Sequence, residues 1–124
     1  MREILFKAKR TDNGEWVEGD LVHSVYKIND VCVGKYGSEI GMHQVEPDTI
    51  CQFTGLLDKN GNKIWENDIL KNKRLKYKVV WDEEEGSLMC ESISGARYGI
   101  GKINCINFEV IGNIFDNPEL LERN

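Results

Sequence analysis

Apolar residues in this sequence occur in short runs, and turn-forming residues separate these runs along the whole chain. The longest runs hold two or three residues, as in Ile4-Leu5-Phe6, and the 124 residues include 12 glycines but only 2 prolines. Short runs bounded by Gly, Asn and Asp are typical of β-strands joined by tight turns. We therefore expect a mainly β fold, with no membrane-spanning helix because such a helix needs about 20 apolar residues.

Alternating polar and apolar residues locate the strands that we expect. They cover residues 4–9, 16–26, 31–33, 49–53, 63–65, 77–81, 87–92 and 108–115. Asn13-Gly14 predicts a type I′ hairpin turn, whose two central residues have positive φ, and Asn60-Gly61 predicts a second tight turn. Gly86 is expected to take the left-handed position in the loop that follows the acidic residues 82–85. Residues 95–101 are expected to be irregular.

Two stretches of the chain resemble each other, residues 13–22 and residues 60–70. Both contain Glu, then Gly or Asn, then Asp and two apolar residues. Gly19 and Asn67 can adopt the left-handed conformation that most residues avoid, and Gly19 also predicts a bend or bulge in its strand. Asp20 and Asp68 are expected to accept hydrogen bonds from nearby backbone amides. The similarity fits either two hairpins of similar shape or a duplicated β unit.

The segment 117–122 has the strongest helix-start signals in the chain. Asn117 can cap a helix, Pro118 suits its first position, and Glu119 favours the positive end of the helix dipole. A helix of one or two turns is not stable alone in water, so its two leucines must pack on a surface. That surface is either the β structure of the same chain or a neighbouring copy.

Charge and cysteine content indicate a small, soluble, cytosolic domain. The net charge of −5 weighs against general nucleic-acid binding, because an acidic surface repels phosphates. No signal-peptide pattern follows Met1, so we expect reduced thiols, although four cysteines would permit two disulfides. Cys51 and Cys90 occupy alternating apolar positions and are expected in the core. Cys32 and Cys105 complete the set.

Enzymatic chemistry has weak support in the sequence. His23 and His43 are the only histidines, and no Cys-x-x-Cys pair supplies metal ligands at zinc-site spacing. Residues 95–101 lack the glycine spacing of a dinucleotide loop, so we expect no cofactor. Asp20 and Asp68 could form a carboxylate pair for hydrolysis, but their turn context favours a structural role. We expect a protein that is not an enzyme.

Three segments carry a resemblance to a known family. They are MREILFKA at residues 1–8, QFTGLLDKNGNKIWENDI at 52–69 and FEVIGNIFDNPELL at 108–121. Together and in this order, they resemble the YopX-like family of phage and prophage proteins. Two positions depart from the family pattern: Lys9 stands where a tryptophan is frequent, and Asn67 where glycine is usual. Residues 27–47 and 92–106 match no pattern that we can name.

The resemblance implies a single YopX-like domain over residues 1–124 and an origin in a bacterial prophage or mobile element. It implies an SH3-like barrel or roll at about residues 49–116, with an N-terminal β unit at about 1–48 and a short C-terminal helix at 117–122. The family is uncharacterised as to activity, so the resemblance assigns no catalytic residue.

Five cations lie close together in the sequence: Lys71, Lys73, Arg74, Lys76 and Lys78. Small β-barrels can bind single-stranded nucleic acid with positive charge beside stacking aromatics, and Tyr77 and Trp81 are near. Alternation places these two aromatics opposite Lys76 and Lys78, however, which predicts core positions for them. The acidic residues 83–85 follow on the same hairpin and oppose phosphate. A simpler interpretation is that the lysines protect an edge strand from pairing.

The sequence leaves a non-catalytic protein-interaction or assembly module as the leading hypothesis. Small β domains have exposed edges and apolar patches that self-association or a partner protein can cover. The expected partner is therefore a second copy of the chain or another phage or host protein. Single-stranded nucleic acid is the alternative, and no membrane partner is expected.

Overall fold

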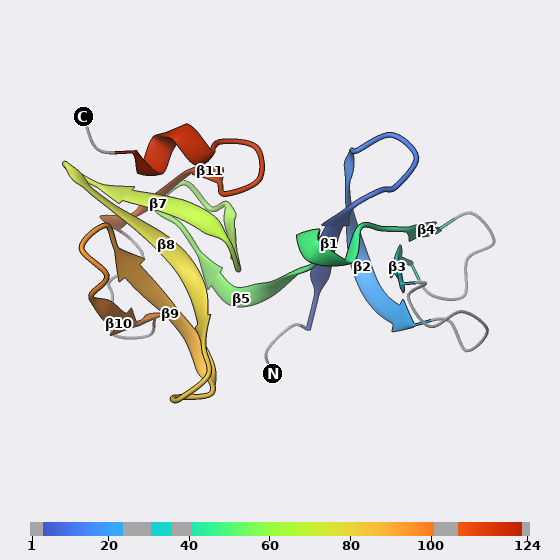
Figure 1. Ribbon diagram of the computed structural model, residues 1–124, viewed down its shortest axis with the longest axis horizontal. Coiled ribbons are helices and arrows are strands. Elements are labelled where there is room, and N and C mark those ends of the chain that lie inside the picture. Colours follow the sequence, from blue (N-terminus) through green and yellow to red (C-terminus); the bar gives the residue numbers. More distant parts are fainter. Residues whose placement is uncertain (1–3, 24–30, 36–40, 101–106, 123–124) are drawn as a thin grey trace. The chain divides into compact units, whose positions relative to one another are not determined.

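The computed structural model describes residues 4–23, 31–35, 41–100 and 107–122. The chain divides into two compact units, residues 1–53 and 54–124 (Figure 1). Antiparallel strands dominate both units, so the mainly β prediction is confirmed. No helix in the described ranges is long and apolar enough to cross a membrane.

Unit 1 is built from four short strands and the start of a fifth. They are β1 (Phe6–Lys9), β2 (Trp16–His23), β3 (Val31–Gly34), β4 (Met42–Gln44) and β5 (Cys51–Leu57), with a 3-10 turn, η1 (Pro47–Thr49), before β5. The strand order is β4-β3-β2-β1-β5. Ala8, Val31, Val33 and Val45 form the core of this unit. An isolated bridge between Arg10 and Val45 also joins the end of β1 to the residue after β4.

Strand β2 changes its partner halfway along its length. Residues 16–19 pair with β1, and residues 20–23 pair with β3. The change occurs at Gly19, whose φ is +152° and whose position leaves no room for a Cβ beside the Gly34 carbonyl. The glycine therefore serves a close backbone approach, and β2 continues through it as one strand.

Unit 2 contains the later part of β5 and six further strands. They are β6 (Lys63–Trp65), β7 (Asp68–Asn72), β8 (Leu75–Asp82), β9 (Ser87–Ser92), β10 (Arg97–Gly99) and β11 (Glu109–Asn113). Strand β6 pairs with β5, and the other five form a sheet in the order β10-β9-β8-β7-β11. Among the described residues this sheet does not close into a barrel. Its core consists of Ile64, Leu70, Val79, Cys90 and Phe108.

Several local predictions can be compared with the structure directly. Gly86 has φ +62° and Asn67 has φ +72°, as predicted. The type I′ turn at Asn13-Gly14 is wrong, because only the glycine has positive φ. The tight turn at Asn60-Gly61 is confirmed, since the Gly61 amide donates to the Asp58 carbonyl at 3.1 Å. Each of these loops is longer than two residues: backbone bonds join Arg10 N to Glu15 O and Asp58 N to Asn62 O. The irregular stretch predicted at 95–101 also contains a strand, β10, at Arg97–Gly99.

The two similar stretches do not fold alike. Residues 16–23 form one continuous strand, whereas the second stretch forms β6 and β7 with a tight turn at Asn67 between them. The structure therefore gives no support to a duplicated β unit. Gly19 and Asn67 both have positive φ, but β2 runs through Gly19, whereas a turn that contains Asn67 separates β6 from β7.

The C-terminal segment forms a 3-10 helix, η4 (Pro118–Leu121), rather than an α-helix. Asn117 does not cap it. The Asn117 Oδ1 atom instead accepts the Asn113 amide at 3.3 Å, and its side chain lies where a Cβ at Gly112 would have to be. The Lys76 Nζ atom of β8 donates to the Leu120 carbonyl at 2.9 Å. The segment is thus held by its own chain, the first of the two surfaces expected.

The buried carboxylate of Asp58, whose residue is 5% exposed, links two separate parts of unit 2. Its Oδ1 atom accepts the amides of Asn60 and Asn62, both at 2.9 Å. Its Oδ2 atom accepts the Val110 amide, also at 2.9 Å. Burial alone would raise the pKa of Asp58, but these amides, with that of Val110 first, together lower the pKa below its ordinary value.

Replacing Asp58 by alanine should lower the free energy of unfolding at neutral pH by about 3 kcal/mol, because three backbone amides lose a buried, charged acceptor. Since the folded-state pKa is lowered, the carboxylate stabilises the fold above about pH 4, and this contribution is lost as the pH falls through that pKa. Urea unfolding at neutral and acidic pH measures both effects. A loss that stays the same as the pH falls from neutral through the acidic range would contradict this role.

Deleting residues 117–124 should destabilise the chain without changing its oligomeric state at a given concentration. The deletion removes the Lys76–Leu120 bond and the packing of Leu121 near Ile93. Thermal melting and light scattering measure the two effects separately. A change of oligomeric state at unchanged stability would show that the segment packs on a neighbouring copy instead.

Candidate functional site

Asp20 and Asp68, the alternative carboxylate pair, belong to different units, so neither unit contains both. Asp68 in unit 2 is 2% exposed, and its Oδ2 atom accepts the Trp65 amide at 2.8 Å. This bond holds the turn between β6 and β7, which is the structural role expected. Asp20 lies within β2 of unit 1, and its backbone-acceptor role stays a prediction. In the described ranges, no three metal-ligating side chains gather into a site.

The histidines and cysteines occupy strand positions. His23 ends β2 and is exposed, and His43 lies in β4. Cys51 and Cys90 are buried, as predicted, and the Cys51 Sγ atom donates to the Thr49 carbonyl at 3.2 Å. Cys32 is half-buried, and Cys105 lies outside the described residues.

The five clustered cations lie along one hairpin of unit 2. Lys71 is on β7, Lys73 and Arg74 form the two-residue turn, and Lys76 and Lys78 are on β8. Strand β8 lies between β7 and β9, so the interpretation of these lysines as guards of an edge strand is wrong. The charges gather at the turn because β7 and β8 pair up to Asn72 and Leu75.

The cations differ in how far neighbouring groups neutralise them. Lys78 forms an ion pair with Glu91 at 3.5 Å, and Lys76 donates to the Leu120 carbonyl. Within the described part of the chain, Lys71, Lys73 and Arg74 form no ion pair. Three positive charges at one end of β8 therefore remain available to a partner.

The two aromatic residues of β8 have different environments. Tyr77 packs edge-on against Phe108, with ring centroids 5.4 Å apart, and joins the core as predicted. Trp81 is 47% exposed, so its predicted core position is wrong. Both residues have the same strand parity, but the core ends near Val79 and Cys90, and Trp81 lies beyond it at the start of the hairpin tip.

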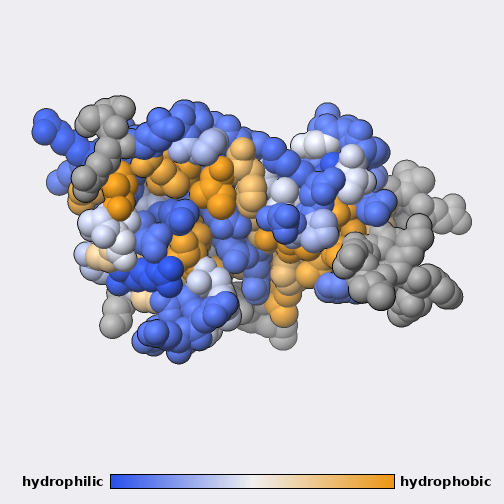
Figure 2. All heavy atoms as spheres, in the orientation of Figure 1, coloured by the Kyte–Doolittle hydropathy of each residue, from blue (hydrophilic) through white to orange (hydrophobic). Residues whose placement is uncertain are grey.

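A shallow groove adjoins the basic turn, and we call it the basic–apolar groove. It is lined by Arg74, Leu75, Lys76, Tyr77, Ser92, Ile93 and Ser94. Leu75 is 60% exposed and Ile93 is 45% exposed, so two large apolar side chains face solvent beside the cations. Figure 2 shows hydrophobic side chains reaching the surface among hydrophilic ones. The groove holds about 300 Å³, the lower limit for small-molecule pockets, and is open to solvent.

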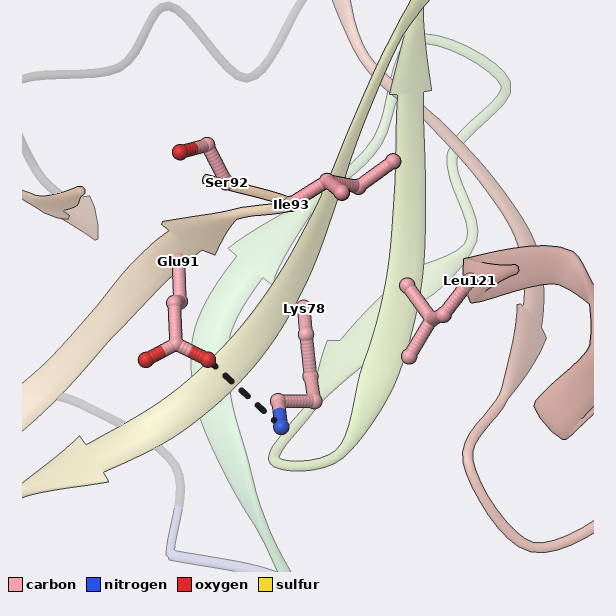
Figure 3. A pocket seen from close by; sticks show the side chains of 5 residues that line it. All are labelled: Lys78, Glu91, Ser92, Ile93 and Leu121. Carbon is pink, nitrogen blue, oxygen red and sulfur yellow. Dashed lines mark ion pairs between the residues drawn. The ribbon is translucent and has the colours of Figure 1, made fainter. Parts of the chain in front are cut away.

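Ile93 also borders a second hollow, which Figure 3 shows from close by. Lys78, Glu91, Ser92 and Leu121 complete its lining. Leu121 comes from η4 and points toward the sheet, beside the Lys78–Glu91 ion pair. Ile93 thus joins the basic–apolar groove to the surface where the C-terminal segment lies.

A chain of ion pairs crosses strands β8, β9 and β10. Glu91 contacts Lys78 at 3.5 Å and Arg97 at 3.0 Å, and Arg97 also contacts Asp82 at 2.9 Å. The backbone amide of Glu85, and then Arg97, lower the pKa of Asp82 below its ordinary value. Asp82 in turn, followed by Glu91, raises the pKa of Arg97. These contacts fix the base of the acidic hairpin tip.

Sequence reasoning missed most of this site. The hydrogen bond from the Asn60 amide to Asp58 could have been predicted, because an Asp side chain in a loop often accepts the amide two residues later in an Asx turn. Nothing in the sequence predicted the exposure of Leu75, Ile93 and Trp81, because alternation predicts the face of a strand and not where the core ends. Arg97 was missed because its strand has three residues.

The comparison with protein families decides the affiliation of the chain. The family model described as YopX protein matches residues 5–122, nearly the whole sequence. The chain belongs to the YopX family. Among solved structures, it is similar to the crystal structure of protein EF1440 from Enterococcus faecalis, with a TM-score of 0.62 and 25% identity. The similarity covers 98% of this chain and 100% of that one. No curated protein matches the sequence.

Replacing Glu91 by glutamine should lower the free energy of unfolding by about 1 kcal/mol, because a half-buried carboxylate that holds two cations is lost. The loss should shrink at high salt, which screens the ion pairs. Glu109→Gln is the matched control, since its pair with Lys59 is exposed and spans 3.7 Å. Urea unfolding at low and high salt measures both variants. Equal losses of stability in the two variants, with equal salt dependence, would refute the role of Glu91.

Proposed function

We propose that this YopX-family chain is a non-catalytic protein-interaction module, and that its basic–apolar groove binds an acidic segment of a partner protein. The observation that carries the proposal is the exposure of Leu75 and Ile93 beside Arg74 and Lys76, which form no ion pair with any residue that the structure describes. An apolar contact surrounded by charge is typical of a protein interface, because burial supplies affinity and charge supplies specificity.

The local charge of the groove is opposite to that of the whole chain. Five of the eight residues from 71 to 78 are cations, although the net charge is −5. A positive patch on an acidic protein attracts acidic segments and directs their approach. Each apolar side chain that such a segment covers adds up to about 1.5–3 kcal/mol. The groove therefore fits a partner that carries acidic residues around an apolar anchor.

The turn at the rim of the groove contains backbone strain. Lys73 has φ +58°, a conformation that glycine adopts freely and lysine adopts at a cost of about 1–2 kcal/mol. Strained residues of this kind gather at functional sites, where the side chain is needed. A lysine in this position supports a role for its charge.

Single-stranded nucleic acid fits the groove less well. Base stacking requires an exposed aromatic ring, but the Tyr77 ring packs against Phe108 and Tyr98. Trp81 is exposed, but it is followed by the acidic residues 83–85, which repel phosphates. The groove thus offers charge without a free stacking platform.

The test measures the binding of a fluorescein-labelled peptide that has glutamates on both sides of one tryptophan. Fluorescence anisotropy of the peptide reports the binding. Arg74→Glu should weaken binding at least about tenfold, since it replaces an attraction by a repulsion. Ile93→Ser should weaken it through the lost apolar contact. Lys59→Glu is the control, because it makes the same charge change outside the groove.

A labelled oligothymidylate is measured in parallel. Peptide binding that depends on Arg74 and Ile93 but not on Lys59 supports the proposal. Equal effects of Arg74→Glu and Lys59→Glu would overturn it. Tighter binding of the oligonucleotide than of the peptide, with a steep salt dependence, would replace it by the nucleic-acid alternative.

A further inference from the structure

We infer that the segment held by the basic–apolar groove is the acidic hairpin tip of a second copy of this chain. The tip comprises residues 81–85, which are the last two residues of β8 and the first three of the turn that leads to β9. This inference rests on the proposed function and names its partner. It follows from the chemistry of the tip, from its fixed shape, and from its position on β8.

The tip has the chemistry that the groove requires. Glu83, Glu84 and Glu85 are exposed, and in the described part of the chain they form no ion pairs. Trp81 lies beside them and is 47% exposed, so one large apolar side chain adjoins three negative charges. A tryptophan ring next to an arginine such as Arg74 also forms a favourable cation–π pair.

The tip is held in shape before it meets a partner. The Gly86 amide donates to the Asp82 carbonyl at 2.8 Å, and the Glu85 amide donates to Asp82 Oδ1 at 2.9 Å. Arg97 holds the other oxygen of Asp82 at 2.9 Å. A segment that is already ordered loses little conformational entropy on binding, which favours association.

The position of the tip excludes contact with its own groove. The groove lies at the start of β8 and the tip at its end, so the two features are at opposite ends of one strand (Figure 1). The Cα atoms of Leu75 and Trp81 are about 20 Å apart, since a strand rises about 3.3 Å per residue. The contact must therefore form between molecules. Two copies in opposite directions would make two identical contacts, which closes a dimer.

Charge reversal tests the contact in the full-length chain. The tip variant is Glu83→Lys with Glu84→Lys, and the groove variant is Lys73→Glu with Arg74→Glu. We expect each variant alone to associate at least about tenfold more weakly than the unmodified chain in sedimentation equilibrium. An equimolar mixture of the two variants should associate again, because each reversed tip then meets a reversed groove and each original tip an original groove.

Two further variants separate the contact from general effects. Glu15→Lys with Glu18→Lys makes the same charge change as the tip variant on exposed residues of unit 1, and it should leave association unchanged. Trp81→Ser leaves the charge of the tip intact and should weaken association through the lost apolar contact. About half of this side chain is buried, so the unfolding of both chains is compared at concentrations at which the unmodified chain is monomeric, which separates lost stability from lost association.

The outcomes distinguish this inference from the proposed function. Weaker association of both reversed variants, with recovery in the mixture, supports the inference. Failure of the mixture to recover would overturn it, as would an unmodified chain that is monomeric at every concentration. If the acidic peptide still binds in an Arg74-dependent manner in that case, the groove serves another protein and the proposed function stands. If neither the tip nor the peptide binds, both fail.

Discussion

The fold of unit 2 depends on one buried carboxylate that joins the first strand region of the unit to its last strand. Asp58 directly follows β5, and its two oxygens accept the amides of the following loop and the Val110 amide of the last strand. The adjacent Lys59 amide also donates to the Phe108 carbonyl at 2.9 Å. Phe108 is thereby placed in the core, where it packs against Tyr77. The carboxylate and this backbone bond together join two segments that are about 50 residues apart in the sequence.

Strand β8 connects this core to the surface. Its middle residue Val79 is fully buried, whereas Leu75 at one end and Trp81 near the other are exposed. Cations gather at the first end and carboxylates at the second, so one rigid element presents opposite charges about 20 Å apart. Such a separation persists because the strand is central in its sheet and cannot fold back on itself. The candidate interface is therefore a consequence of where the core begins and ends.

Particular residues show how far the sequence could predict the structure. The alternation around Tyr77 and Val79 gave the correct face for both, and the buried positions of Cys51 and Cys90 followed from the same pattern. Both Asn-Gly turns were located correctly, but the type I′ conformation predicted at Asn13-Gly14 was wrong, because that loop is longer than two residues and only its glycine has positive φ. The YopX resemblance was also visible in the sequence, and the match over residues 5–122 bears it out.

The sequence by itself determined the β character of the chain and the left-handed residues Asn67 and Gly86, because both depend on residues that are close in the sequence. It also determined the family, because the motifs of the family are stretches of sequence. Only the tertiary structure decided that Trp81 is exposed, that Asp58 binds Val110, and that Arg97 joins Glu91 to Asp82. Local patterns cannot encode these features, since each depends on which strands lie side by side and on where the shared core ends. The basic–apolar groove belongs to the second group, because its apolar lining comes from β8 and from the residue after β9.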